Sequence, residues 1–496
     1  MFIGRPISAV AGLLLLVLLS RLLSKDEYGI YFAVWAMAEI IILASNLGLM
    51  SAVYRYVSSN EVAQGGIIIE GPVWQFVGMR LLFLALGALA VVYCGQLLSL
   101  LISPYQVSEV ISLCIVIIVV SEGLARFGES VFDAILCQGR SQLTLIGRTC
   151  FRLVGVLVCF SVGKISIDTV IYIEAAATSL AAMVSVLMLL QLSLKSRKLA
   201  VAHAVQHDEK PSALRMFKFA APAYLSQILS LVYGPDMLKL VLGGAVGPAL
   251  LANFGFAYSL AAVVQRYMPA NLLAGVFRPA FVAASKKSEA NHLLGCLVSV
   301  CIKINMLFVI PFILCSIFSS NEILGLLSHG KYADAGLVLS IILLGLAAIA
   351  IHLVISLYCL AIEKSLPIFF ASLASAICLP LAISIAKQAG AVGIAIVFAL
   401  SEVVWCLIAV SLLIKWRAWI SMEYRHLLKL VSCAVLVWCG GLLLQWLAMP
   451  WFIITALMPV LFIATCWLAN IFDATERDWF CSLFPFLGRV LRSHHA

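Results

Sequence analysis

Long apolar runs separated by short polar breaks extend along nearly the whole chain. Most runs have about 20 residues, the length at which a helix crosses roughly 30 Å of hydrocarbon. Strands are excluded, because apolar and polar residues do not alternate and only helices or closed barrels satisfy the backbone in lipid. The pattern predicts about 14 membrane-spanning helices, over residues 6–23, 29–52, 73–101, 108–137, 142–163, 167–194, 216–243, 248–283, 291–318, 333–361, 365–386, 391–415, 426–447 and 450–470.

The composition also indicates a chain that spans a membrane. Of its 496 residues, 64% are hydrophobic and 11% are charged, and its mean hydropathy of +1.12 lies far outside the range of soluble domains. We therefore expect an all-α polytopic membrane protein. The first run starts at Pro6 and has no small-residue cleavage site after it, so we expect it to remain as the first span.

The longest internal polar stretch, residues 195–218, has six predicted helices before it. A weak internal sequence similarity relates residues 22–31 to residues 240–249 and aligns Gly29 with Gly247. We therefore predict two six-helix lobes of like topology with two helices appended. The predicted parts are a first lobe, a basic cytoplasmic linker, a second lobe, helices 13 and 14, and a cytoplasmic tail, over residues 1–194, 195–218, 219–418, 419–472 and 473–496.

Basic residues are distributed unevenly between the two sides of this arrangement. They gather in the linker, in the tail and in the loops on that same side, whereas the opposite loops hold Arg21, Lys25, Lys164, Lys331 and Lys387. Positive residues favour the cytoplasmic side, so both termini are predicted to be cytoplasmic. Membrane orientation explains the net charge of +9 better than nucleic-acid binding does, because no soluble module collects the charge.

A group of charges interrupts the fourth predicted helix at residues 121–133, in the sequence SEGLARFGESVFD. Glu122, Arg126, Glu129 and Asp133 are spaced by four, three and four residues, which places them on one helix face. A charge at mid-bilayer costs about 3 kcal/mol on insertion scales. This face is therefore expected to contact protein or water.

The fifth predicted helix offers partners for this face. A turn at residues 139–142 would place residues whose numbers sum to about 281 at equal depth, so that Asp133 faces Arg148 and Glu129 faces Arg152. These four residues are either ion pairs that hold the two helices together or part of a polar lining.

Arg126 falls opposite Gly155 in the same register, where no countercharge is available. It is either a cation that reaches a central cavity or the partner of Glu122, one turn away. On the seventh helix, Asp236 follows the pair Gly234 and Pro235, which can break a helix and free carbonyl groups. Asp236 is either a coupling site for a cation or proton, or it is bridged to Lys239 across a simple kink.

At three places the chain carries segments typical of one family of membrane transporters. They are SRLLSKDEYGIYFAVWAMAEIIILASNLGLMSAVYRYVS at residues 20–58, LLSHGKYADAGLVLSIILLG at 326–345 and KQAGAVGIAIVFALSEVVW at 387–405. Through them the chain resembles the polysaccharide and oligosaccharide flippases, the Wzx-like branch of the multidrug/oligosaccharidyl-lipid/polysaccharide exporter superfamily. The resemblance implies two six-helix lobes around a central cavity and an alternating-access cycle.

The resemblance also implies a substrate and its partners. Flippases of this family carry an isoprenoid (undecaprenyl)-diphosphate-linked oligosaccharide to the outer leaflet of the bacterial inner membrane, for O-antigen (lipopolysaccharide), capsule or exopolysaccharide assembly. The implied partners are membrane lipids, a polysaccharide polymerase and a chain-length regulator. A diphosphate that crosses a low-dielectric barrier needs cations along its route, and guanidinium groups grip two phosphate oxygens. The predicted substrate-binding cations, from different helices, are Arg55, Arg126, Arg266 and Lys303.

The mid-span carboxylates are candidates for ion coupling, and the coupling ion stays open among them. They are Glu39, Glu122, Asp236 and Glu402.

Two other functions remain as alternatives. One is a cation-coupled exporter of organic cations from the same superfamily, which would favour an acidic cavity. The other is a membrane-embedded glycan polymerase or ligase, which would usually need a sizeable outside loop with catalytic residues. The sequence shows no nucleophile and base in a soluble cleft, so we predict a transporter that is not an enzyme.

No metal or cofactor is expected either. The 15 cysteines contain no C-x-x-C pair. The phosphate-loop mimic at residues 325–332 has Tyr332 where a magnesium-binding Ser or Thr belongs.

Overall fold

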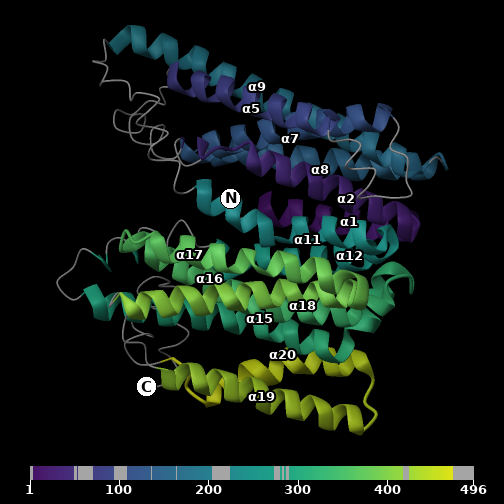
Figure 1. Cartoon of the computed structure of the whole chain (residues 1–496), viewed down its shortest axis with the longest axis vertical. Helices are drawn as coiled ribbons and strands as arrows, with labels where there is room; N and C mark the ends of the chain where they lie inside the picture. The colour runs from purple at the N-terminus through teal and green to yellow at the C-terminus, as the bar shows by residue number, and fades with distance from the viewer. Residues whose placement is uncertain are drawn as a thin grey trace. The chain divides into compact units, whose positions relative to one another are not determined.

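The computed structural model describes residues 4–49, 53, 71–93, 109–135, 137–163, 165–203, 224–272, 277, 280–281, 284–285, 290–416 and 424–472. Over these residues the chain is helical and has no strand (Figure 1). The elements are α1 (Gly4–Leu22), α2 (Lys25–Ala44), α5 (Gly71–Tyr93), α7 (Glu109–Ala134), α8 (Gln138–Ser161), α9 (Ile167–His203), α11 (Pro235–Val246), α12 (Pro248–Arg266), α13 (Pro269–Leu272), α15 (Ala290–Ser328), η1 (Ala333–Ala335), α16 (Gly336–Ala361), α17 (Leu366–Ala376), α18 (Cys378–Lys415), α19 (Tyr424–Trp446) and α20 (Trp451–Leu468).

The distribution of polar and apolar side chains is that of a membrane protein. Within the described residues, 11 helical segments are long and apolar enough to cross a membrane. Large apolar side chains such as Leu407 and Leu436 are exposed, whereas the charged side chains of Arg80, Glu122 and Lys303 are buried. Lipid favours this arrangement because a charge is tolerated only where protein surrounds it. The chain is therefore an all-α, multi-pass membrane protein, as the sequence predicted.

Several helix ends differ from the predicted spans. The ninth span was predicted to end at residue 318, but α15 continues to Ser328 through a non-helical residue at Ser319. The apolar residues after the kink extend the hydrophobic run, which hides the end of the span from a hydropathy reading. α9 likewise continues to His203, into the segment predicted to be a linker. The break predicted at Gly234 is present, since Gly234 is extended (φ −69°, ψ 164°) and Pro235 starts α11.

The chain divides into two compact units. The first comprises residues 1–256 and 382–391. Within it α7 packs against α2, α5, α8 and α9, while α1 packs against α8 and α2 packs against α11. Figure 1 shows α5, α7, α8 and α9 side by side, in the purple to teal part of the chain. This unit contains most of the charges that the sequence analysis singled out.

The second unit comprises residues 257–381 and 392–496. Its centre is the long hairpin of α15 and α16, which η1 joins. α20 and α19 pack against α15 and against each other, and α13 and α17 pack against α16.

α2 carries several residues of the site described below, and its start is fixed by local contacts. Ser24 Oγ accepts a hydrogen bond from the Glu27 N–H at 3.2 Å, and the Glu27 carboxylate accepts one from the Ser24 N–H at 2.9 Å. This capping box satisfies backbone donors that helix geometry leaves without partners. One turn later, Gly29 lies so close to the Pro248 carbonyl that any Cβ would overlap it. α2 and the start of α12, where Pro248 lies, can approach this closely only because residue 29 has no side chain.

Candidate functional site

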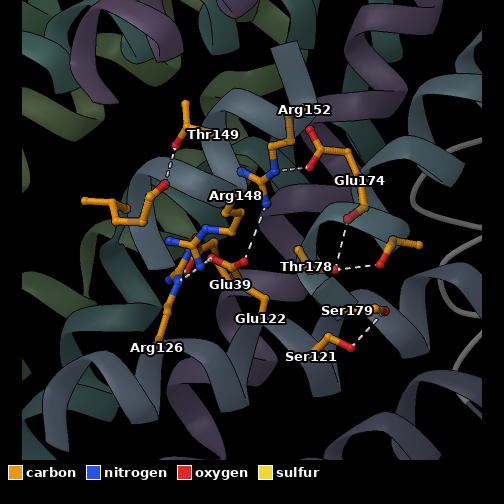
Figure 2. A network of polar contacts seen from close by, with 12 residues as sticks. Glu39, Ser121, Glu122, Arg126, Arg148, Thr149, Arg152, Glu174, Thr178 and Ser179 are labelled. Carbon is orange, nitrogen blue, oxygen red and sulfur yellow. Dashed lines mark hydrogen bonds and ion pairs between the residues drawn. The ribbon is translucent and has the colours of Figure 1, made fainter. Parts of the chain in front are cut away.

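Seven charged side chains from four helices of the first unit meet inside it, and Figure 2 labels all of them except Glu129. We call this set the charge network. It consists of Glu39 on α2, Glu122, Arg126 and Glu129 on α7, Arg148 and Arg152 on α8, and Glu174 on α9.

Arg126 is held by two carboxylates. Its Nη1 and Nη2 donate to the two oxygens of Glu39 at 2.7 and 2.5 Å. Its Nε donates to Glu122 Oε1 at 2.7 Å. The predicted partnership of Arg126 with Glu122 is therefore confirmed. The Glu39 contact is the bidentate arrangement in which a guanidinium fork matches a carboxylate.

Glu122 lies at the centre of the charge network. Besides Arg126, it contacts Arg148 Nη1 at 2.8 Å and Arg152 Nη2 at 3.5 Å. Only 1% of its side chain is exposed. Three guanidinium groups around one buried carboxylate provide the compensation that a charge away from water requires.

A second buried contact connects α8 and α9 to α2. Arg152 Nε lies 2.6 Å from Glu174 Oε2, and the Tyr31 hydroxyl donates to Glu174 Oε1 at 3.0 Å. The Arg152 guanidinium also lies over the Trp35 ring, 4.8 Å from its centroid, a cation–π contact. These contacts connect the three helices α2, α8 and α9.

The charge network is not equally buried throughout. The exposed fractions of the Arg126 and Glu39 side chains are 31% and 23%, compared with 6% for Arg148 and 2% for Glu174. The pair of Arg126 and Glu39 is therefore the part of the charge network that a polar ligand reaches first.

The register between α7 and α8 differs from the predicted one. Arg148 pairs with Glu129 at 3.3 Å and with Glu122, and Arg152 pairs with Glu122 and Glu174. The predicted pairing of Arg148 with Asp133, and of Arg152 with Glu129, is wrong, because the observed partners on α7 lie one to three turns earlier. The reason is the position of the turn, because α7 ends at residue 134 and α8 starts at 138, before the turn that the sequence predicted.

Arg80 on α5 is a buried cation that the sequence analysis did not select. Arg80 is 1% exposed. Its Nη2 donates a hydrogen bond to the Ile42 carbonyl at 2.9 Å, and its Nη1 donates one to Ser45 Oγ at 3.3 Å. Its Nε has no acceptor, and no carboxylate of the described residues pairs with it. A buried arginine without a countercharge is energetically costly.

The remaining predicted residues lie apart from the charge network. Asp236 Oδ1 lies 2.8 Å from Lys239 Nζ, so the alternative of an ion pair beside a kink is the one that the structure shows. In the second unit, Arg266 ends α12 and is exposed. Lys303 on α15 is fully buried, with its Nζ 5.9 Å from the centroid of the Phe472 ring. Arg55 lies outside the described residues.

Glu402, also predicted, lies in a separate cluster of the second unit. Its Oε2 is 2.9 Å from His352 Nδ1, which joins α18 to α16. The His352 ring stacks on Trp405 with 3.5 Å between centroids, and Trp405 Nε1 donates to Ser372 Oγ at 3.1 Å. His352 was not among the predicted residues, although a polar residue within an apolar run is a signal that the sequence itself carries. Among the described residues, no three His, Cys, Asp or Glu side chains gather as metal ligands.

Comparison with solved structures places this fold among membrane transporters. The chain is similar to a structure described as lipid II flippase MurJ in an inward closed conformation, with a TM-score of 0.70, 13% identity and coverage of 94% of this chain and 98% of that one. It is also similar to a multidrug resistance MATE family transporter of the MOP superfamily in its outward-facing conformation, with a TM-score of 0.52, 15% identity and coverage of 84% and 94%. A Vibrio cholerae MATE transporter matches with a TM-score of 0.50, 17% identity and coverage of 83% and 94%.

No protein-family model matches the chain, and no curated protein matches it. At these identities the structural likeness establishes the fold.

Proposed function

We propose that this protein is a flippase that moves an isoprenoid-diphosphate-linked oligosaccharide from the cytoplasmic to the outer leaflet of a bacterial inner membrane. The observation that carries the proposal is the extent of the structural likeness. The MurJ flippase matches 94% of this chain with a TM-score of 0.70. The MATE transporter matches 84% with a TM-score of 0.52. Membership of the multidrug/oligosaccharidyl-lipid/polysaccharide exporter superfamily belongs to the same proposal.

The buried arginines support an anionic substrate. Arg126 presents its guanidinium at the more exposed end of the charge network, and Arg80 adds a buried positive charge that no carboxylate of the described residues neutralises. A substrate with a diphosphate group would supply negative charge beside Arg80, whose own charge no carboxylate of the described residues neutralises. A neutral sugar or a hydrophobic cation would supply no negative charge there.

We propose further that the site faces the two sides of the membrane in turn, that the glycan serves O-antigen, capsule or exopolysaccharide assembly, and that both termini are cytoplasmic. A polysaccharide polymerase and a chain-length regulator would act on the product after it is exposed. The isoprenoid chain would stay in the lipid while the polar headgroup passes through the protein.

Transport in proteoliposomes tests this function. Purified protein is reconstituted with a fluorescent isoprenoid-diphosphate oligosaccharide, and a membrane-impermeant glycosidase is added outside. We expect protein-dependent cleavage of the lipid that starts in the inner leaflet, beyond the half that is accessible in protein-free vesicles. Cleavage that stays at the protein-free level, with proton and sodium gradients imposed in turn, would refute the proposed function.

A second candidate is export of organic cations. It is favoured by the partly exposed carboxylate of Glu39, which would attract a cation if Arg126 moved away. The same vesicles distinguish the two functions when they are loaded with ethidium instead of the lipid. Gradient-driven movement of ethidium without exposure of the oligosaccharide would favour this second candidate.

A further inference from the structure

The bond between Glu39 and Arg126 differs from the other ion pairs of the charge network. Both side chains are partly exposed, at 23% and 31%. Glu122 and Arg148 are exposed by 1% and 6%. An ion pair near polar surroundings is worth little, and a competing anion can replace one partner without transferring the other into lipid.

Arg126 would keep its orientation if Glu39 left. Its Nε is bonded to Glu122, which is itself held by Arg148. Its Nη1 and Nη2, which Glu39 now occupies, would then form a free fork. The spacing of two oxygens on one phosphate suits this fork as well as that of a carboxylate does.

Arg80 supplies a second and independent sign of a missing anion. It is nine-tenths buried or more, its Nε has no acceptor, and its contacts are to neutral oxygens of Ile42 and Ser45. Ile42 follows Glu39 by three residues, so both lie on one face of α2. Arg80 and Arg126 therefore meet the same face of α2 one turn apart, and α2, α5 and α7 pack against one another there.

We propose that Glu39 holds the place of the substrate's diphosphate. In the empty protein its carboxylate neutralises Arg126, and on loading the diphosphate displaces Glu39 and takes over both Nη groups of Arg126 beside the positive charge of Arg80. When the substrate leaves, Glu39 returns, so that Arg126 does not remain a bare cation during the return of the empty protein. This inference rests on the proposed function and identifies the group that its substrate displaces.

The affinity for an isoprenoid diphosphate tests the displacement. The full-length protein is placed in nanodiscs, and binding of farnesyl diphosphate is measured by titration calorimetry. Glu39→Gln keeps the shape of residue 39 but removes the competing charge, so its Kd should fall about tenfold relative to the unchanged protein. Arg126→Gln should lose binding. Glu322→Gln, the same change at an exposed position of α15, is the matched control and should leave the Kd unchanged.

Two further ligands separate the contribution of the isoprenoid chain to binding from that of the diphosphate. Farnesol lacks the diphosphate, so its affinity should be equal in all variants. Inorganic pyrophosphate lacks the chain, and a gain with Glu39→Gln for pyrophosphate alone would indicate a site for free anions rather than for the lipid. If Glu39→Gln proves unstable, Glu39→Asp keeps the charge but shortens the side chain and should give an intermediate gain.

The outcomes distinguish this inference from the proposed function. An unchanged Kd in Glu39→Gln, or full binding by Arg126→Gln, would overturn the displacement even if the oligosaccharide is transported. Tighter binding by Glu39→Gln without any oligosaccharide transport by the unchanged protein would support the anion site and contradict the flippase.

Discussion

Removal of the central carboxylate of the charge network, Glu122→Gln, should destabilise the protein far more than Glu39→Gln. Glu122 is 1% exposed and contacts three guanidinium groups, which would all lose a buried countercharge. Breaking a buried pair costs about 3–5 kcal/mol. Each arginine keeps one other carboxylate, so we expect the lower end, about 3 kcal/mol. The Glu39 pair is roughly a quarter exposed, for which about 1 kcal/mol is expected.

The assay is reversible unfolding in mixed micelles, in which SDS is titrated into dodecyl maltoside and helicity is followed by circular dichroism. Glu322→Gln on the exposed side of α15 serves as the control for the loss of one negative charge. The expected order of stability is the unchanged protein and the control first, then Glu39→Gln, then Glu122→Gln. Equal losses for Glu39→Gln and Glu122→Gln would refute the argument that burial sets the strength of these contacts.

Two more substitutions test the fold and the site separately. Gly29→Ala should reduce the yield of folded protein, because the added methyl group meets the Pro248 carbonyl and overpacking costs about 1–3 kcal/mol. Gly12→Ala has open space around it and should leave the yield, measured by size-exclusion chromatography, unchanged; equal yields for the two would contradict the close approach. Arg266→Gln should abolish oligosaccharide exposure without loss of stability, since Arg266 is exposed at the end of α12. Normal transport by Arg266→Gln would remove this residue from the predicted substrate route.

Much of the fold could be predicted from hydropathy alone. Apolar runs of membrane length identify spans because the bilayer leaves a helix as the simplest way to satisfy the backbone. The charged face of α7 was also visible, since spacings of three and four place residues on one side of a helix. The break at Gly234 follows from the stereochemistry of the proline after it.

The tertiary partners could not be predicted in the same way. Glu39 and Arg126 are 87 positions apart, and nothing in the local sequence indicates that α2 packs on α7. The register of α7 and α8 depended on where the chain turns, and an error of a few residues there shifted the pairs by one to three turns. Arg80 and Glu174 are different, because each interrupts an apolar run and would have been found by applying the mid-span criterion to every charge.

The measurement that tests the central claim most directly is the leaflet exposure of an isoprenoid-diphosphate oligosaccharide, compared in vesicles that contain the unchanged protein, Arg126→Gln or no protein. The account predicts that the impermeant glycosidase cleaves lipid from the inner leaflet only with the unchanged protein. Arg126→Gln vesicles should match the protein-free ones although the variant is folded by circular dichroism. Two results would contradict the claim that this protein carries a diphosphate-linked lipid through its buried arginines. One is equal exposure in all three kinds of vesicle, and the other is equal exposure in vesicles with the unchanged protein and with Arg126→Gln.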